Sequence, residues 1–251
     1  MKKLMILIAL SISFITLSAC SSSTETITVL TSSGYEPYQM VNEAGELIGF
    51  DIDLMEAIAT YLGWEIVWQD VDFDGIIASL QAGQAPLAIA GITPTAERAQ
   101  MVDFSDIYFS SEEGLQNFLV FSSSTPLNGL NDLSGKVIGA QLGTIQAELL
   151  TSLADEYNFT VDLRNQNAQI VEEIQNGRID ALVVESVVAD AILANNTQLS
   201  SSLLDADISS IFGNAIAVGK NTGYLDSINE AIAALIEDGT LAGLITQWFG
   251  E

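Results

Sequence analysis

Two spacings of hydrophobic residues alternate along the chain after residue 26, and they predict strands and helices in turn. Short apolar runs such as ITVLT are typical of buried strands, whereas apolar residues three and four positions apart, as from Leu54 to Leu62, predict helices. We expect Asp51 to cap the helix that follows it. The part of the chain before Phe118 contains predicted strands at 27–31, 65–69 and 86–93, and helices that begin near Asp51, Asp74 and Thr95.

The same alternation restarts at Phe118 and continues to the C-terminus. This second series has predicted strands at 118–121, within 136–144, and at 159–163, 181–185 and 214–219, with helices between them and two more at the C-terminus.

The two series predict an α/β protein with two lobes, each a mostly parallel sheet flanked by helices. We assign residues 27–117 and 216–251 to the first lobe and 118–215 to the second, with the strands FLVF and NAIAVG as a two-strand hinge. Ligands of open α/β sheets bind at the carboxyl ends of strands, near helix N-termini. Thr93 and Thr144 both lie at such ends, so we expect the site in the cleft between the lobes.

The N-terminal residues have the features of an export signal. A basic pair precedes an apolar run, residues 4–17, which is shorter than a typical membrane span. The run ends in LSAC, which resembles a bacterial lipobox, where the cysteine receives a lipid and becomes the new N-terminus. An ordinary signal peptide or a buried cysteine are the alternatives, but Cys20 is the only cysteine and lies where the apolar run stops. We therefore expect residues 1–19 to be removed and residues 20–26 to tether the protein outside the cell membrane.

Composition excludes several functions. Without residues 1–19, the chain has five basic and 33 acidic residues, a net charge of −28. Nucleic acid is excluded as a partner, because phosphate binding needs clustered Lys and Arg, and the lipid rather than a basic patch must hold the protein at the membrane. The chain has no histidine, which excludes Ser-His-Asp and Cys-His catalysis and histidine metal sites. We expect no metal and no cofactor.

Arg98 is the only positively charged residue between Lys3 and Lys136, a stretch rich in Asp and Glu. A lone guanidinium in such a field is a candidate binding group for an anion. The alternative is a surface arginine paired with Glu97 or Asp103, which would contribute only about 0–1 kcal/mol.

Six motifs occur in order along the chain: GYEPYQMVNEAGELIGFDIDLMEAIATYLG, VDFDGIIASLQAGQ, AIAGITPTAERAQMVDFSDIYF, QLGT, GRIDALVVE and DGTLAGLITQWFG. Together they resemble the polar amino-acid substrate-binding proteins of bacterial ABC importers, the family 3 solute-binding proteins, in their lipoprotein form. The resemblance implies a periplasmic-binding-protein type 2 fold that closes on an α-amino acid and delivers it to a membrane permease. It implies no enzymatic activity, and we expect a monomer.

The resemblance also implies the roles of individual residues. Arg98 would clamp the α-carboxylate of the ligand with two parallel, charge-assisted hydrogen bonds. Glu185, on the other lobe, would receive the ammonium group, so that only the closed form satisfies both charges of the zwitterion. The other implied contacts are Thr93, backbone N–H groups at Thr144 and Ile145, the backbone of Ala90 and Gly91, and the aromatic pair Tyr35 and Phe73.

Departures from the family pattern bear on specificity. Ser32 stands where relatives often have an aspartate, and Gln141 stands where some have a charged residue or histidine. With Gln146, these residues indicate an uncharged, hydrogen-bonding end of the pocket. This favours a polar neutral amino acid, with glutamine first, while the acidic field keeps a basic amino acid open.

Other interpretations stay open from the sequence. Glu185 alone could be a helix N-cap, isolated threonines are more often turn or cap residues, and isolated aromatics are more often core. Some proteins of this fold are dehydratases of prephenate-like acids, and Glu185 could then act as general acid. A ligand-sensing module is a further alternative.

Overall fold

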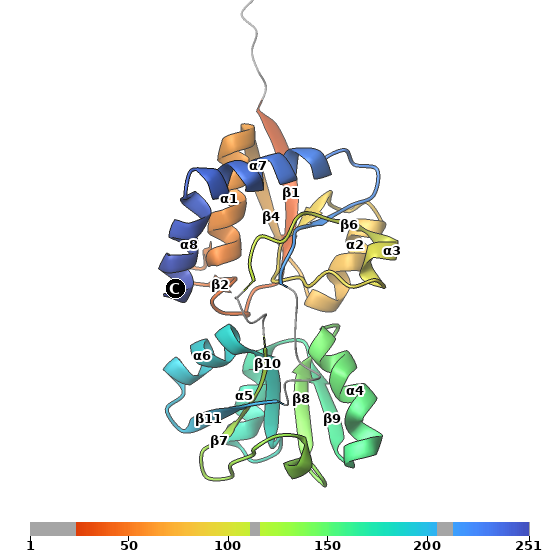
Figure 1. Ribbon diagram of the computed structural model, residues 1–251, viewed down its shortest axis with the longest axis vertical. Coiled ribbons are helices and arrows are strands. Elements are labelled where there is room, and N and C mark those ends of the chain that lie inside the picture. Colours follow the sequence, from red (N-terminus) through yellow and green to blue (C-terminus); the bar gives the residue numbers. More distant parts are fainter. Residues whose placement is uncertain (1–23, 111–115, 205–212, 251) are drawn as a thin grey trace, which may run out of the picture.

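The computed structural model describes residues 24–110, 116–204 and 213–250, which form two lobes stacked along the long axis of the molecule (Figure 1). The predicted signal peptide and Cys20 lie outside the described residues. None of the helices in these ranges combines the length and the apolar character that crossing a membrane requires.

The first lobe contains a five-stranded mixed sheet with the order β4-β1-β5-β12-β6. β1 and β4 are parallel from Glu25↔Trp64 to Thr31↔Asp70, so β1 begins two residues before the predicted strand and takes in the end of the predicted tether. β12 runs antiparallel to both neighbours, because it enters this sheet from the second lobe. The strands are β1 (Glu25–Thr31), β4 (Trp64–Asp70), β5 (Leu87–Ala88), β6 (Asp103–Phe104) and β12 (Ala217–Val218).

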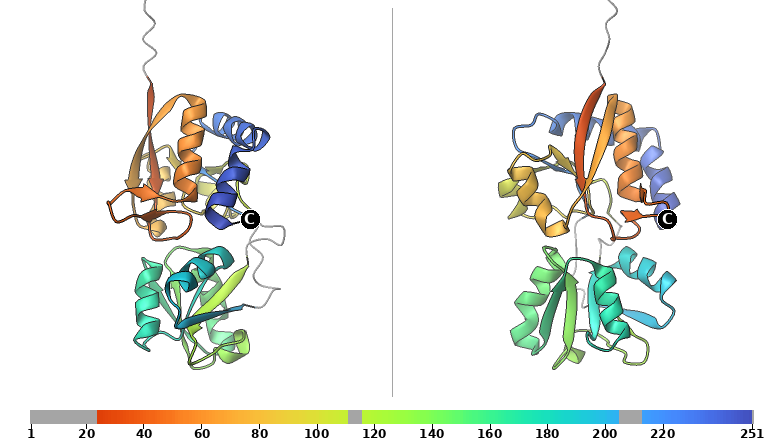
Figure 2. Two further views of the ribbon diagram at one scale, coloured as in Figure 1. Left: turned by 90° about the vertical axis from the view of Figure 1, so that its left-hand side faces the viewer. Right: turned by 180° about the vertical axis from the view of Figure 1, so that it is seen from behind.

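Helices cover both faces of this sheet, as the alternation along β1 requires (Figures 1 and 2). Val29 packs in the cluster that contains α1 and α7, and the next residue, Leu30, packs in the cluster that contains α2. The other elements of this lobe are α1 (Phe50–Leu62), η1 (Phe73–Gly75), α2 (Ile76–Gln81), α3 (Arg98–Met101), α7 (Leu225–Glu237), α8 (Thr240–Phe249) and the small hairpin β2 (Met40–Val41) and β3 (Leu47–Ile48).

The second lobe contains another mixed sheet, with the order β11-β7-β10-β8-β9. β10 is parallel to β8 and antiparallel to β7. The sequence did not predict β11, because the three serines of LSSSL give no apolar run, yet it pairs with β7 along its whole length. The elements are β7 (Asn117–Ser122), η2 (Leu130–Asp132), β8 (Val137–Gln141), α4 (Ile145–Tyr157), β9 (Thr160–Arg164), α5 (Asn167–Gln175), β10 (Ala181–Glu185), α6 (Ser186–Asn195) and β11 (Leu199–Leu203).

The predicted hinge is misplaced, and the predicted mostly parallel sheets are mixed. FLVF lies in β7, which is paired on both sides in the second sheet, and NAIAVG contributes β12 to the interior of the first. Strands paired on both sides are held by their neighbours and cannot act as free connections. The chain instead crosses between the lobes after β6 and after β11.

Candidate functional site

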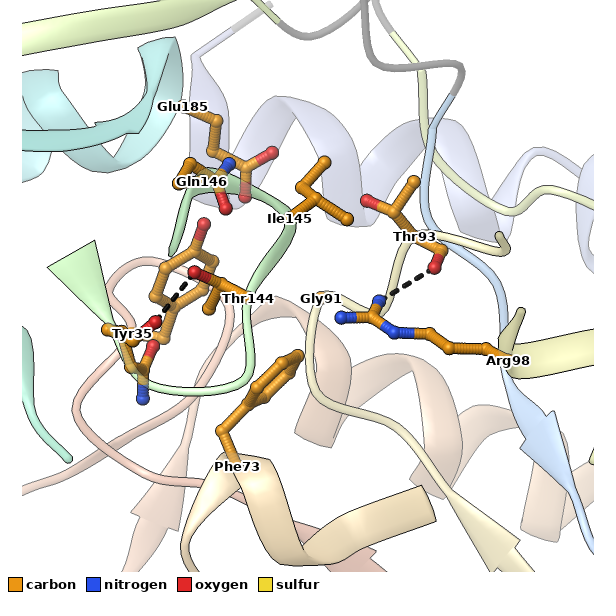
Figure 3. Close-up of a pocket in the computed structure, with 10 residues that line it drawn as sticks. Tyr35, Phe73, Gly91, Thr93, Arg98, Thr144, Ile145, Gln146 and Glu185 are labelled. Atoms are coloured by element: carbon orange, nitrogen blue, oxygen red, sulfur yellow. Dashed lines mark hydrogen bonds between the residues drawn. The ribbon is translucent and has the colours of Figure 1, made fainter. Parts of the chain in front are cut away.

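A small cavity lies between the two lobes and is lined by residues from both (Figure 3). Of the twelve predicted ligand-contacting residues, ten line it. Ser32 and Ala90 do not, because both are buried behind the wall, each with 1% of its surface exposed. The lining residues are Tyr35, Phe73, Gly91, Thr93 and Arg98 from the first lobe and Gln141, Thr144, Ile145, Gln146 and Glu185 from the second.

The part of the first lobe's wall around Gly91 is irregular backbone and not the continuation of the strand predicted over 86–93. β5 ends at Ala88, and Gly91 has a φ of +59°, a left-handed conformation that glycine adopts without strain. The N–H of Gly91 donates to Oδ2 of Asp51 at 2.6 Å.

Asp51 therefore does not cap α1 as predicted. Gly49 occupies the N-cap position without a side-chain bond, and Asp51 lies within the first turn. Sequence reasoning missed this residue as part of the site. A signal was present, because Asp51 falls on the same helical stripe as the buried Leu54, Met55 and Ile58.

Arg98 begins α3 and is only 7% exposed. Its Nη1 donates to the carbonyl oxygen of Thr93 at 2.8 Å (Figure 3). Its Nη2 donates to the carbonyl oxygen of Gly143, on the other lobe, at 2.9 Å. The guanidinium lies 5.6 Å from the centre of the Phe73 ring. Burial lowers its pKa, but an arginine keeps its charge. A guanidinium has five N–H donors, so others are left for an anion.

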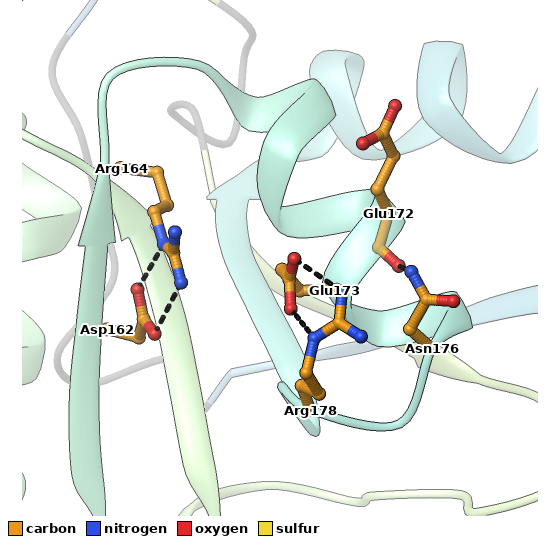
Figure 4. A network of polar contacts seen from close by, with 6 residues as sticks. All are labelled: Asp162, Arg164, Glu172, Glu173, Asn176 and Arg178. Carbon is orange, nitrogen blue, oxygen red and sulfur yellow. Dashed lines mark hydrogen bonds and ion pairs between the residues drawn. The ribbon is translucent and has the colours of Figure 1, made fainter.

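The other basic residues of the described ranges are engaged elsewhere. Lys136 pairs with Asp180, and Lys220 donates to the carbonyl oxygen of Gln100. By contrast, Arg98 forms no ion pair with any described residue, so the alternative of a surface pair with Glu97 or Asp103 is wrong. The two arginine pairs of the second lobe, Arg164 with Asp162 and Arg178 with Glu173, are shown in Figure 4.

The N-terminus of α4 brings free backbone donors to the same cavity. The Thr144 hydroxyl accepts from the Ala147 N–H at 3.2 Å, so Thr144 is the N-cap of this helix. Its own N–H donates to the Gln141 carbonyl at 3.3 Å and is not free as predicted. The N–H groups of Ile145 and Gln146 have no partner within the described part of the chain. With the positive end of the helix dipole, they favour an anion.

Glu185 brings an acidic group to the same cavity. It ends β10, is 2% exposed, and makes no capping bond to α6. Burial raises its pKa from 4.5 to about 8; the hydroxyl of Tyr35 lowers the pKa, the negative charge of Asp51 raises it, and the hydroxyl of Tyr38 lowers it. Its Oε1 lacks a hydrogen-bond partner among the described residues. A buried carboxylate in this position can accept bonds from a cation.

Two amide side chains of the second lobe, those of Gln141 and Gln146, line the cavity. Gln141 donates from Nε2 to the Asn165 carbonyl at 2.9 Å, and Gln146 donates from Nε2 to Oδ1 of Asn117 at 3.1 Å. Because these bonds engage the amide nitrogens, the carbonyl oxygens of the two side chains are left without a bond to the described residues.

The arrangement can therefore bind a small zwitterion. Arg98 and the N-terminus of α4 supply donors for a carboxylate, and Glu185 supplies an acceptor for an ammonium group; these groups line the same cavity. Within the described ranges, no group of three or more Cys, Asp or Glu side chains is placed to hold a metal ion.

Comparison with known proteins agrees with this geometry. The family model for bacterial extracellular solute-binding proteins, family 3, matches residues 27–251. The arginine-binding extracellular protein ArtP of Bacillus subtilis is 35% identical, over 99% of this chain and 98% of its own. ABC transporter arginine-binding protein 1 of Escherichia coli is 31% identical over the whole of both chains.

Solved structures show the same fold. An ancestral arginine-binding protein bound to glutamine superposes with a TM-score of 0.83 and 34% identity, over 91% of this chain and all of the other. The same kind of protein bound to arginine gives a TM-score of 0.81 and 34% identity, over 89% and 98% of the chains.

Proposed function

Since the chain belongs to the bacterial extracellular solute-binding proteins of family 3, we propose that it captures a basic L-amino acid, with arginine as the first candidate, and delivers it to an ABC transporter permease. Proteins of this family bind solutes, so the chain is a binding protein and not a dehydratase. Glutamine is the second candidate.

The placement of Arg98 and Glu185 on opposite lobes carries this proposal. An α-amino acid presents a carboxylate and an ammonium group next to each other, and both need partners when they leave water. Only the closed arrangement of the lobes brings both partners to one ligand. Capture would therefore be coupled to closure, because the ligand makes more contacts in the closed form than in the open one.

The side-chain end of the pocket supports a basic ligand. The free oxygens of Gln141 and Gln146 accept hydrogen bonds, and a guanidinium has only donors. Asp70 ends β4, at the edge of the first lobe's sheet, and Asp72 and Asp74 follow it. Asp72 accepts from Asn165 of the second lobe at 3.0 Å. Relatives named as arginine-binding proteins support the same choice, which replaces glutamine as the first candidate.

Calorimetric titration of the mature chain with arginine, glutamine and an uncharged control such as leucine tests the proposal. We expect arginine to bind with a Kd near micromolar, about −8 kcal/mol. Arginine at about 1,000 times its Kd should raise the free energy of unfolding by about 4 kcal/mol, which a thermal melt detects. If none of the common amino acids binds or raises the melting temperature, the proposal is refuted.

We also propose that residues 1–19 are removed and that a lipid on Cys20 anchors the protein outside the cell membrane. The apolar run, the single cysteine and the polar residues after it support this proposal. Mass spectrometry of the protein from a membrane fraction should find a diacylated N-terminal peptide beginning at Cys20. An unmodified Cys20 would contradict it.

A further inference from the structure

Asp51 is a buried acid that the proposed function leaves without a role. It lies in the first turn of α1, behind the cavity wall, with 0% of its surface exposed. Burial raises its pKa from 3.8 to about 7, although its hydrogen bonds from Gly91 and Tyr108 oppose this rise. A leucine would continue the apolar stripe of the helix at a lower cost in stability. A buried acid that lowers the stability of the protein, and that is joined by one hydrogen bond to a residue lining the ligand cavity, indicates a functional role.

Both oxygens of Asp51 are engaged within the first lobe. Oδ2 accepts the Gly91 N–H at 2.6 Å, and Oδ1 accepts the Tyr108 hydroxyl at 2.9 Å. The charged and titratable groups that face it are Tyr35, Tyr38, Tyr108 and Glu185. None of the described lysines or arginines pairs with it. Its oxygens are therefore committed to the protein. Besides the effect of its charge on Glu185, Asp51 contacts the cavity wall only through its hydrogen bond with Gly91.

The backbone N–H of Gly91 needs a hydrogen-bond acceptor to fix the orientation of its peptide. Gly91 lines the cavity but has no side chain to anchor it, and a Cβ there would lie 3.3 Å from the Tyr35 ring. Glycine has the widest choice of backbone angles, so the orientation of its peptide must be set by a hydrogen bond. The hydrogen bond that the Gly91 N–H donates to Asp51 sets this orientation. It also joins the wall to Tyr108, on the segment by which the chain leaves the first lobe.

We propose that Asp51 is a positioning residue of the ligand site, whose carboxylate holds the Ala90–Gly91 peptide in the orientation that amino-acid binding requires. The inference rests on the function proposed above.

Two substitutions at this position separate positioning from packing. Asp51→Leu fills the space but leaves the Gly91 N–H and the Tyr108 hydroxyl without their acceptor. Asp51→Asn keeps an oxygen for Gly91 and can donate to the Tyr108 hydroxyl. The matched control is Asp53→Asn, the same chemical change two residues along α1, at an acid that accepts from Trp248 away from the cavity.

Arginine titrations and ligand-free thermal melts of these variants form the first test. We expect Asp51→Leu to weaken binding about ten- to hundredfold, as loss of a hydrogen bond to a charged group does. Its melting temperature should stay within about 4 °C of wild type, because removal of the buried acid offsets the loss of its two hydrogen bonds. Asp51→Asn and Asp53→Asn should bind within about threefold of wild type. Unchanged affinity in Asp51→Leu, a loss of affinity that follows a loss of stability, or failure of Asp51→Asn to restore binding would overturn the proposal.

The amide resonance of Gly91 gives a second test that needs no ligand. In the wild type this amide should be protected from hydrogen exchange and should shift with pH near 7, and Asp51→Leu should remove both properties. Equal protection in wild type and Asp51→Leu would overturn the proposal. Failure of the wild type to bind any amino acid would refute the proposed function instead. The exchange protection of the Gly91 amide would still show whether Asp51 holds this peptide.

Discussion

At the scale of single residues, Arg98 and Glu185 are each buried without an ion-pair partner among the described residues. Burying each charge lowers the stability of the ligand-free protein. Burial accordingly lowers the pKa of Arg98 and raises that of Glu185, and both shifts favour the neutral form of the group. A zwitterion supplies both missing partners. The two residues should therefore matter much more for binding than for folding.

Arg98→Ala should abolish detectable arginine binding, because it removes the partner of the carboxylate. The ligand-free melting temperature should stay within about 4 °C of wild type, since the buried charge is removed together with its two hydrogen bonds to carbonyls. Calorimetry and thermal melts measure these effects. Arg164→Ala, at an exposed pair of the second lobe, is the control and should bind normally. Near-normal affinity in Arg98→Ala would exclude the carboxylate clamp.

Glu185→Gln should abolish binding yet stabilise the ligand-free protein at alkaline pH. The pKa of Glu185 is raised from 4.5 to about 8, so the folded state holds a proton that the unfolded state releases. Its contribution to the free energy of unfolding is thus complete below about pH 4.5 and is lost as the pH rises towards 8, by at most about 1.4 kcal/mol per pH unit.

Thermal melts of wild type and Glu185→Gln at pH 5 and pH 8 measure this effect. The variant should lose less stability than wild type over this range. Equal losses in the two proteins would show that Glu185 is not buried in its neutral form.

At the scale of elements, α4 brings its N-terminus to the cavity because Thr144 caps it. The cap fixes the first turn, in which the N–H groups of Ile145 and Gln146 are free of partners in the described structure. Substitution of Thr144 should therefore change both stability and binding, whereas substitution of Arg98 should change mainly binding.

Thr144→Ala should lower the free energy of unfolding by about 1 kcal/mol and weaken arginine binding, while Thr144→Ser should retain both. Thr151 lies on the same helix and donates to the Ala147 carbonyl, so Thr151→Ala is a matched control. Denaturant unfolding and calorimetry measure the two quantities. If Thr151→Ala weakens binding as much as Thr144→Ala, the effect is not due to the cap.

At the scale of the whole molecule, the lobes meet closely at Gly143. This residue has a φ of +79°, and a Cβ there would lie 2.7 Å from the Cα of Asp74, on the other lobe. A side chain at Gly143 is therefore incompatible with the closed arrangement, although the second lobe could still fold around it.

Gly143→Ala should prevent ligand-driven closure. Gly177, with a φ of +68° and open space around it, is the matched control, because alanine there suffers the same backbone strain without a contact. Small-angle scattering should show that arginine compacts wild type and Gly177→Ala but not Gly143→Ala. Compaction of Gly143→Ala equal to that of wild type would show that closure does not bring these residues together.

Most elements and most of the site could be predicted from the sequence, because both leave local patterns. The apolar run of β1 and the spacing along α1 follow from burial on one or two faces. The prediction failed where pairing partners decide the structure. β11 is a strand because β7 lies beside it, and the predicted strand through Gly91 stops at Ala88.

The sequence by itself determined the alternating elements, the acidity, the isolation of Arg98 and the family, because these are properties of residues and their order. Only the tertiary structure decided that Arg98 is buried without a carboxylate partner among the described residues, and that Ser32 lies behind the cavity wall. It also revealed the bond between Asp51 and Gly91. These facts depend on contacts between residues about 40 or more positions apart. The sequence could not predict them, because hydrophobic periodicity shows which side of an element is buried but not which residues that side contacts.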